Sequence, residues 1–433
     1  MLRMIPTARR RQAGSALAMA LALAGGATVV TAAVSSPALA QRNGREQQPQ
    51  QQTLSADFQK VYQPVADATN TSGDLAAAKA GVPALLAGVK TPYDRFHAGN
   101  ILVQLGSKAQ DKALQKQGLE LMIASGQATP ADTGLFRYFL GGLALDAKDY
   151  AGARRELEAS LAAGFQGDAA KKQDPWGLIA ESYFEEGQTA QGLDYLKGAI
   201  AQRTAAGQPV TESWLLRGLK VAYDARLADK ATEWSALLVA NSPSEQNWLQ
   251  ALQVVNALNN PDRQAQLDLL RLMALTNSLK DPKDVAKYIE AADPRIMSNE
   301  VGRVLDNAVQ AGLFARTDPY YTQIKGVIDP RMQTDRAEAP NLAATARKAG
   351  SPGTEGQAAG DVFMSLGSYA EAEEMYKLAL ERGGIDRDRA LTRIGIAQVH
   401  QNKLAEARAT FGQVSGNRAA IARMWTAYIE SKA

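Results

Sequence analysis

The sequence predicts an all-α fold built from repeated pairs of antiparallel helices. Helical periodicity dominates from about Leu54 onward, and no stretch shows the alternation of a strand. A helix pattern also recurs, because Ala372 and Tyr376 reappear 35 residues later as Ala407 and Phe411. A period of this length indicates stacked supersecondary units. Finally, alanine is abundant and aromatic residues make up only 6% of the 433 residues, which favours helices packed closely through small side chains.

The N-terminus has the order of segments that is typical of a secretory signal peptide. A basic start with four arginines precedes an apolar run over residues 13–34, and "SPALA" ends at Ala40. We therefore predict a signal peptide over 1–40 with cleavage after Ala40; an uncleaved membrane anchor is the alternative. The chain has no cysteine that could carry a lipid. These features predict export to the bacterial periplasm, without direct membrane insertion after cleavage.

Removal of the signal peptide changes the charge balance. The whole chain carries 48 basic and 45 acidic side chains, a formal net charge of +3. The removed segment holds four arginines and no acidic residue, so 44 basic side chains would remain against 45 acidic ones, a net charge of −1. Because the mature chain is nearly neutral and shows no basic groove, nucleic acid is not expected as a partner.

Five segments follow the signal peptide. Residues 41–53 are rich in glutamine and are predicted to be a disordered tether. Residues 54–280 are predicted to form an N-terminal array of helix hairpins. Several prolines interrupt the pattern over 281–347, which predicts irregular helical hairpins, and "KAGSPGTEGQ" (348–357) is predicted to be a linker. Residues 358–433 carry the C-terminal repeats and a capping helix. The sequence leaves open whether the arrays form one superhelix or two.

The repeat is clearest over residues 176–200, "WGLIAESYFEEGQTAQGLDYLKGAI". The same frame begins again at Trp214 and, 34 residues later, at Trp248. This pattern resembles the tetratricopeptide repeat (TPR), W-x2-L-G-x2-Y followed by A-x3-F. The chain is identified by this resemblance as an exported bacterial member of the TPR family. The resemblance implies a right-handed superhelix of antiparallel helix hairpins, a TPR-like α-solenoid.

The spacing within each repeat has a physical cause. Two antiparallel helices approach closely only where one presents a small residue, such as Gly360 or Ala372. We expect the ring of Tyr376 to fill the space between its own hairpin and the next. One hairpin cannot bury its apolar face alone, so neighbouring copies are required. The last helix would cap the array, or contact a partner, through Ile421, Met424, Trp425 and Tyr428.

The sequence displays no catalytic constellation. Its two histidines, His97 and His400, lie in opposite halves of the chain, whereas metal sites and acid–base pairs need clustered groups. Motifs for an activated serine or a phosphate-binding loop are missing from the sequence. Paired carboxylates such as Glu373 and Glu374 are predicted to be solvated. We therefore expect no enzyme activity, catalytic residue, metal or cofactor; a hydrolase with a cryptic carboxylate pair is the least favoured alternative.

The resemblance implies that the first helix of each hairpin lines a concave surface. On these helices the candidate groove-lining residues are Tyr138, Glu181, Phe184, Glu185, Glu212 and Tyr223. Their acidic and aromatic character suits a basic or aromatic peptide. The same reasoning places further residues on the concave face of the later repeats, namely Asp361, Met364, Arg389, Thr392 and His400.

The leading hypothesis is a periplasmic scaffold for protein–protein interaction in a bacterial envelope complex. Its partner would be another envelope protein or a peptide segment. The family resemblance suggests a role accessory to a trans-envelope transport or assembly system. The alternative is a periplasmic binder of a small ligand or glycan, with Tyr138, Phe184 and Tyr223 as stacking surfaces. The identity of the partner and the oligomeric state are left open.

Overall fold

The computed structural model describes residues 52–432. The predicted signal peptide (1–40) and residues 41–51 of the predicted tether lie outside this range. Over the described residues the chain forms twenty α-helices, α2 to α21, and its only strand-like pairing is an isolated bridge between Asp168 and Gln173. The prediction of an all-α fold is therefore confirmed. None of the described helices combines the length and the apolar character needed to cross a membrane.

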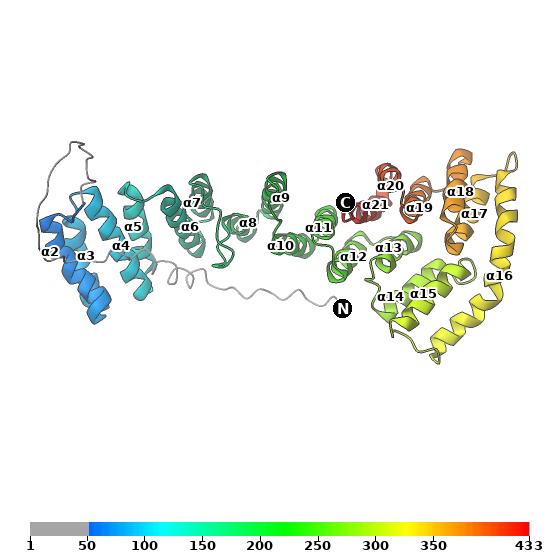
Figure 1. Ribbon diagram of the computed structural model, residues 1–433, viewed down its shortest axis with the longest axis horizontal. Coiled ribbons are helices and arrows are strands. Elements are labelled where there is room, and N and C mark those ends of the chain that lie inside the picture. The colour runs from blue at the N-terminus through cyan, green and yellow to red at the C-terminus, as the bar shows by residue number, and fades with distance from the viewer. Residues whose placement is uncertain (1–51, 433) are drawn as a thin grey trace, which may run out of the picture. The chain divides into compact units, whose positions relative to one another are not determined.

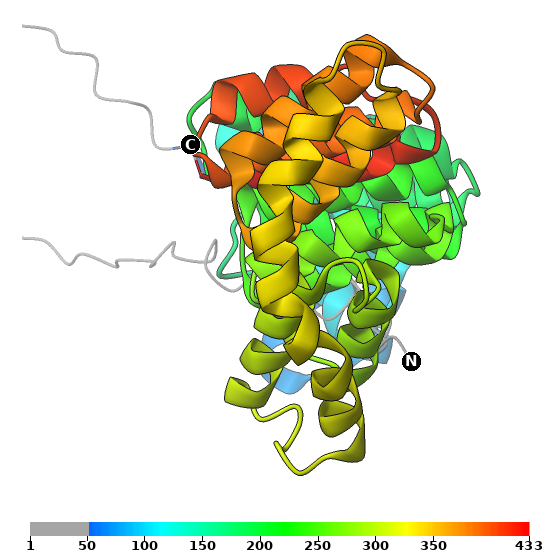
Figure 2. The same ribbon diagram turned by 90° about the vertical axis from the view of Figure 1, so that its right-hand side faces the viewer.

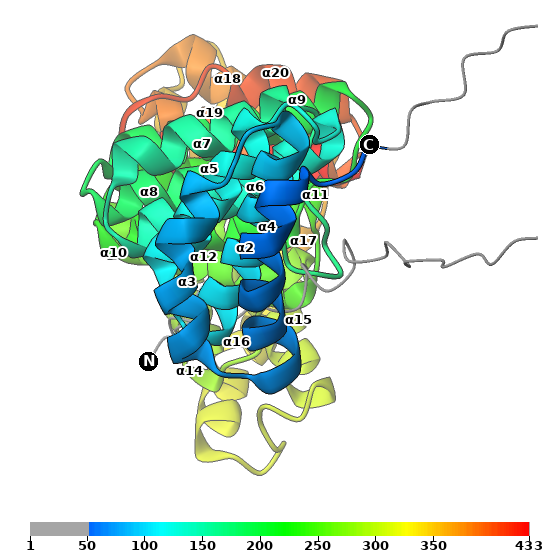
Figure 3. The same cartoon turned by 90° about the vertical axis from the view of Figure 1, so that its left-hand side faces the viewer.

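The described chain divides into two compact units, 52–199 and 200–432, and the boundary falls inside helix α9. In the N-terminal unit consecutive helices pack as pairs, α2 with α3, α4 with α5 and α6 with α7 (Figures 1 and 3). The helices of this unit are α2 (Ala56–Asp67), α3 (Leu75–Ala87), α4 (Pro92–Lys108), α5 (Lys112–Ala124), α6 (Pro130–Asp146), α7 (Tyr150–Ala162), α8 (Pro175–Glu185) and most of α9 (Thr189–Ala205).

The C-terminal unit closes on itself. Its last helix, α21, packs against α11, α12 and α13, and α13 also contacts α19 (Figure 1). One continuous apolar core therefore runs from α11 to α21. The helices of this unit are α10 (Glu212–Asp224), α11 (Ala228–Asn241), α12 (Glu245–Asn259), α13 (Arg263–Leu275), α14 (Pro282–Ala292), α15 (Ser298–Gln310), α16 (Pro319–Arg347), α17 (Gly353–Leu366), α18 (Tyr369–Arg382), α19 (Arg387–His400), α20 (Leu404–Phe411), the 3₁₀ turn η3 (Gly416–Arg418) and α21 (Ala419–Glu430).

Many of the hairpins begin with the same short signal. A threonine or aspartate precedes a proline, and its side-chain oxygen accepts a hydrogen bond from a backbone N–H in the first turn of the helix. The proline fits the first helical position because the N–H that it lacks would have no partner there. These helix-starting caps are Thr91, Thr129, Asp174, Asp281 and Asp318.

The section that breaks the repeat frame is more regular than predicted. Helix α16 is a long helix of 29 residues (Figure 2). It continues through Pro330 and Pro340, which are both exposed. The predicted linker is correspondingly short, because residues 353–357 belong to helix α17. A Cβ atom on Gly356 would lie 2.9 Å from the backbone oxygen of Met375 on α18. Glycine at this position therefore allows α17 and α18 to touch within the segment that the sequence predicted to be a linker.

Glycine against a ring is the contact that repeats within the hairpins. A Cβ atom on Gly360 would lie 2.7 Å from the ring of Tyr376, and one on Gly395 would lie 2.5 Å from the ring of Phe411. The ring of Tyr376 therefore lies inside its own hairpin, against the first helix. The expectation that it fills the seam to the next hairpin is wrong on this point. The sequence period reflects the pairing of a glycine on one helix with a large side chain on the following one.

Substitution of Gly395 by alanine should destabilise the C-terminal unit. The new methyl group would meet the buried ring of Phe411 at 2.5 Å, and overpacking of this kind costs about 1–3 kcal/mol. The matched control is Gly326→Ala in α16, where a Cβ atom meets nothing within 4 Å and alanine should be neutral or slightly stabilising. Urea denaturation of both variants measures the difference. Equal effects of the two substitutions would show that the glycine–ring contact is not tight.

Candidate functional site

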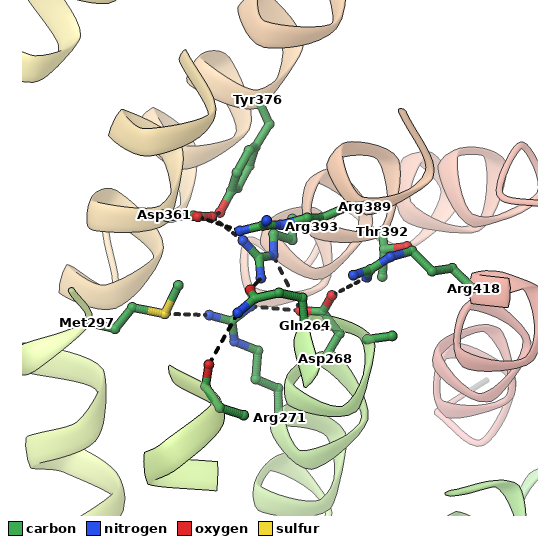
Figure 4. A network of polar contacts seen from close by, with 12 residues as sticks. Gln264, Asp268, Arg271, Met297, Asp361, Tyr376, Arg389, Thr392, Arg393 and Arg418 are labelled. Carbon is green, nitrogen blue, oxygen red and sulfur yellow. Dashed lines mark hydrogen bonds and ion pairs between the residues drawn. The ribbon is translucent and has the colours of Figure 1, made fainter. Parts of the chain in front are cut away.

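The interior of the C-terminal unit holds a buried charge cluster centred on Asp268 of helix α13. The Asp268 side chain is fully buried, and its Oδ1 accepts a hydrogen bond from Arg271 Nη1 at 2.8 Å. Its Oδ2 accepts one from Arg418 Nη1 of η3 at 2.6 Å. The Nε of Arg393 on α19 lies 3.5 Å from Oδ1 (Figure 4). One carboxylate thus joins three arginines, two of which come from distant segments.

Two further carboxylates complete this Asp268 cluster. Glu300 of α15 accepts hydrogen bonds from both Nε and Nη2 of Arg271, at 2.7 and 2.8 Å. Asp361 of α17 pairs with Arg393, and its Oδ1 also accepts a hydrogen bond from the hydroxyl of Tyr376 at 2.6 Å (Figure 4). The cluster therefore links α13, α15, α17, α18, α19 and η3 through charge-assisted hydrogen bonds.

Asp268 and Glu300 are held ionised by the arginines around them. Burial alone would raise the pKa of Asp268, but Arg393, Arg271 and Arg418 outweigh it and lower that pKa below the ordinary value. The pKa of Glu300 is likewise lowered, because Arg271 outweighs the effect of burial. A carboxylate with a lowered pKa is a poor proton acceptor and a poor proton donor near neutral pH. The cluster is thus suited to holding helices together rather than to acid–base catalysis.

The structure contradicts part of the prediction that α17 and α19 line a concave binding face. Asp361, Met364 and Thr392 are all buried within the unit, so the prediction that they line an open groove is wrong. The physical reason is that α17, which carries Asp361 and Met364, packs against α15 and α18, while Arg393 of α19 pairs with Asp361. Helix α19, which carries Thr392, also contacts η3 and α21. His400 does stay exposed, with its ring stacked on that of Tyr369 at a centroid distance of 4.2 Å.

Helix α21 joins the two ends of the C-terminal unit. The fully buried ring of Trp425 stacks on Phe411 of α20, with ring centroids 6.1 Å apart. Its Nε1 donates a hydrogen bond to the backbone oxygen of Asp268 at 3.0 Å. The helix therefore packs on the final hairpin, as expected for a cap, and also on helices from the start of the unit, which was not expected.

Glu373 is a further buried carboxylate, outside the Asp268 cluster, and the prediction that it is solvated is wrong. It is 4% exposed, and its oxygens accept hydrogen bonds from Lys377, Gln398, Gln401 and Lys403 at 2.6–2.9 Å. Burial alone would raise the pKa of Glu373, but these donors outweigh it and lower that pKa to about 2. The carboxylate thus fastens α18 to α19 and to the start of α20.

Substitution of Glu373 by glutamine should destabilise the protein by about 1–3 kcal/mol at neutral pH, because two charge-assisted hydrogen bonds from lysines are weakened. A carboxylate with a lowered folded-state pKa stabilises the fold above its ordinary pKa of 4.5 and loses this contribution as the pH falls toward about 2. The difference in unfolding free energy between the wild type and E373Q should therefore shrink over that range. Urea denaturation at several pH values measures it. The control is Glu374→Gln, whose exposed carboxylate pairs with Arg347 and should contribute little at any pH.

The N-terminal unit offers a cavity instead of a filled interior. Its volume is about 270 Å³, and it lies among the consecutive helices α5, α6 and α7. The floor is apolar and includes the buried side chains of Leu140 and Leu143. The lining residues are Lys116, Glu120, Ile123, Ala124, Arg137, Leu140, Leu143, Ala144, Ala147, Asp149, Gly152, Arg155 and Glu156.

Charged side chains of both signs form the rim of this cavity. Glu156 lies between two arginines, with Arg137 Nη1 at 2.9 Å and Arg155 Nε at 3.4 Å from its oxygens. Lys116 lies 3.9 Å from Glu120, one turn further along α5. An apolar floor inside a polar rim is the usual composition of a site that takes an apolar group and orients it by its charged neighbours.

The six predicted groove-lining residues do not form one site within either unit. Tyr138 is 8% exposed, and its ring packs against Phe139 and Phe165 in the core. On α8, Glu181 and Phe184 are half-buried and Glu185 is exposed. Glu212 and Tyr223 belong to the other unit, where Glu212 is exposed and accepts a hydrogen bond from Asn247 at 2.7 Å.

None of these six residues lines the cavity, and sequence reasoning missed the residues that do. The reason is that the family resemblance directed attention to the first helix of each hairpin. Helix α6 does line the cavity, but the other residues that line it come from α5, from α7 and from the turn between α6 and α7. In the sequence, the charged residues of the cavity resemble those of an ordinary exposed helix surface. The only sequence signal for them was the spacing of Lys116 and Glu120, which places both on one face of the helix.

No group of three or more histidine, cysteine, aspartate or glutamate side chains is placed to hold a metal ion within residues 52–432. The two histidines lie in different units. His97 contacts the rings of Tyr62, Tyr93 and Phe96. A comparison with protein-family models found no match to this chain, and a comparison with curated proteins found none either. The likeness to TPR proteins therefore depends on the residue pattern and the pairing of helices.

Proposed function

We propose that this protein is a TPR-like scaffold of the bacterial envelope, which binds a segment of another protein. In this proposal the helix pairs of each unit follow a right-handed superhelix. The support is the recurrence of one contact in the expected frame, where a glycine faces a large side chain on the next helix. The pairs are Gly141 with Leu157, Gly218 with Trp234, Gly360 with Tyr376 and Gly395 with Phe411.

The observation that carries the binding role is the cavity on α5, α6 and α7. The interior of the C-terminal unit is occupied by its own side chains, such as Arg393 and Trp425, which are fully buried. The cavity in the N-terminal unit, by contrast, is open to a side chain of another molecule. It is built by three consecutive helices of the N-terminal unit.

The setting of the proposal comes from the sequence. A basic, apolar and small-residue N-terminus ending at Ala40 directs the chain to the periplasm. The partner would then be another envelope protein, in a complex for trans-envelope transport or assembly. The proposal assigns no reaction to the chain. Four buried carboxylates are paired with arginine or lysine, namely Asp268, Glu300, Asp361 and Glu373.

Site-specific photo-crosslinking tests the proposal. A photoreactive amino acid replaces Ala147, an exposed residue of the cavity rim, in cells that express the full chain. The matched control position is Gln117, which is exposed on α5 but does not line the cavity. We expect a discrete crosslinked protein with Ala147 and none with Gln117. The same products at both positions, or none at either, would contradict a partner-binding role for this cavity.

A further inference from the structure

We draw no further inference here: the strongest candidate, the surface patch formed by the exposed apolar side chains of Ile296, which precedes α15, and Val327 of α16, borders charged side chains of both signs, and nothing in the structure shows what covers it.

Discussion

Substitution of Asp268 by asparagine is expected to destabilise the C-terminal unit by about 3–5 kcal/mol. The carboxylate is fully buried and compensates Arg271, Arg393 and Arg418. Asparagine keeps the volume but removes the charge, so arginines from α13, α19 and η3 would repel one another in an interior that water does not reach. Urea denaturation followed by tryptophan fluorescence measures the loss, because four of the five tryptophans lie in this unit.

The control for this variant is Asp262→Asn on the same helix. Asp262 is 63% exposed and lies 4.0 Å from Arg418 Nη2, and asparagine caps a helix about as well as aspartate. This control should change stability by less than about 1 kcal/mol. Since the pKa of Asp268 is lowered in the fold, the difference between wild type and D268N should persist below the ordinary pKa of aspartate and fade at lower pH. A loss of stability no larger than that of D262N would show that the arginines do not depend on this carboxylate.

The helices and their pairing could be predicted from the sequence because their signals are local. A threonine or aspartate before proline starts many of the hairpins, as at Thr91 and Asp174. A glycine facing a ring, as in Gly395 with Phe411, recurs at a fixed spacing. Such signals lie within one or two helices, and a periodic pattern reveals them directly.

The closure of the C-terminal unit could not be predicted in this way. Asp268 and Arg418 are separated by 150 residues, and Asp268 and Trp425 by 157. Contacts between such distant residues leave no period in the sequence. Each arginine of the cluster, taken alone, resembles the ordinary charged surface of a helix. The prediction of a concave face at Asp361 and Thr392 was wrong for the same reason. Arg393, which pairs with Asp361, also donates a hydrogen bond to Gln264, 129 residues away, and the helix of Thr392 contacts η3 and α21.

The cluster also explains why this unit needs charges in its interior. Buried ion pairs often stabilise a fold no better than apolar residues of the same size. The bonds of Asp268 to Arg418 and of Asp361 to Arg393 form only when α13 meets η3 and α17 meets α19. Their contribution is therefore to the choice of arrangement, while apolar burial supplies most of the driving force.

Substitution of Trp425 by alanine should cost about 3–5 kcal/mol, the usual loss when a fully buried tryptophan is removed. The ring packs on Phe411 of α20, and its Nε1 donates a hydrogen bond to the backbone oxygen of Asp268 on α13. The variant therefore weakens the contacts of α21 with α20 and with α13 together. Trp425→Phe is the matched variant. It keeps a ring against Phe411 and should lose only about 1–2 kcal/mol, chiefly through the missing hydrogen bond.

Limited proteolysis distinguishes the loss of the contacts of α21 with α11 and α13 from a general loss of stability. When α21 leaves α11 and α13, the segment around Gly412 and Gly416 should become a preferred cleavage site in W425A but not in G395A, even at matched unfolding free energy. Trp425 Nε1 donates to the backbone oxygen of Asp268, and Arg418, which pairs with the Asp268 side chain, immediately precedes α21. The loss of stability in the double variant D268N/W425A should therefore be smaller than the sum of the two single losses, with a coupling of about 0.5–3 kcal/mol. Strict additivity would mean that charge and ring stabilise separate parts of the unit. A loss smaller than the sum would mean that removal of either the Asp268 carboxylate or the Trp425 ring already detaches α21 from α13. The second substitution then removes no further contact between these helices.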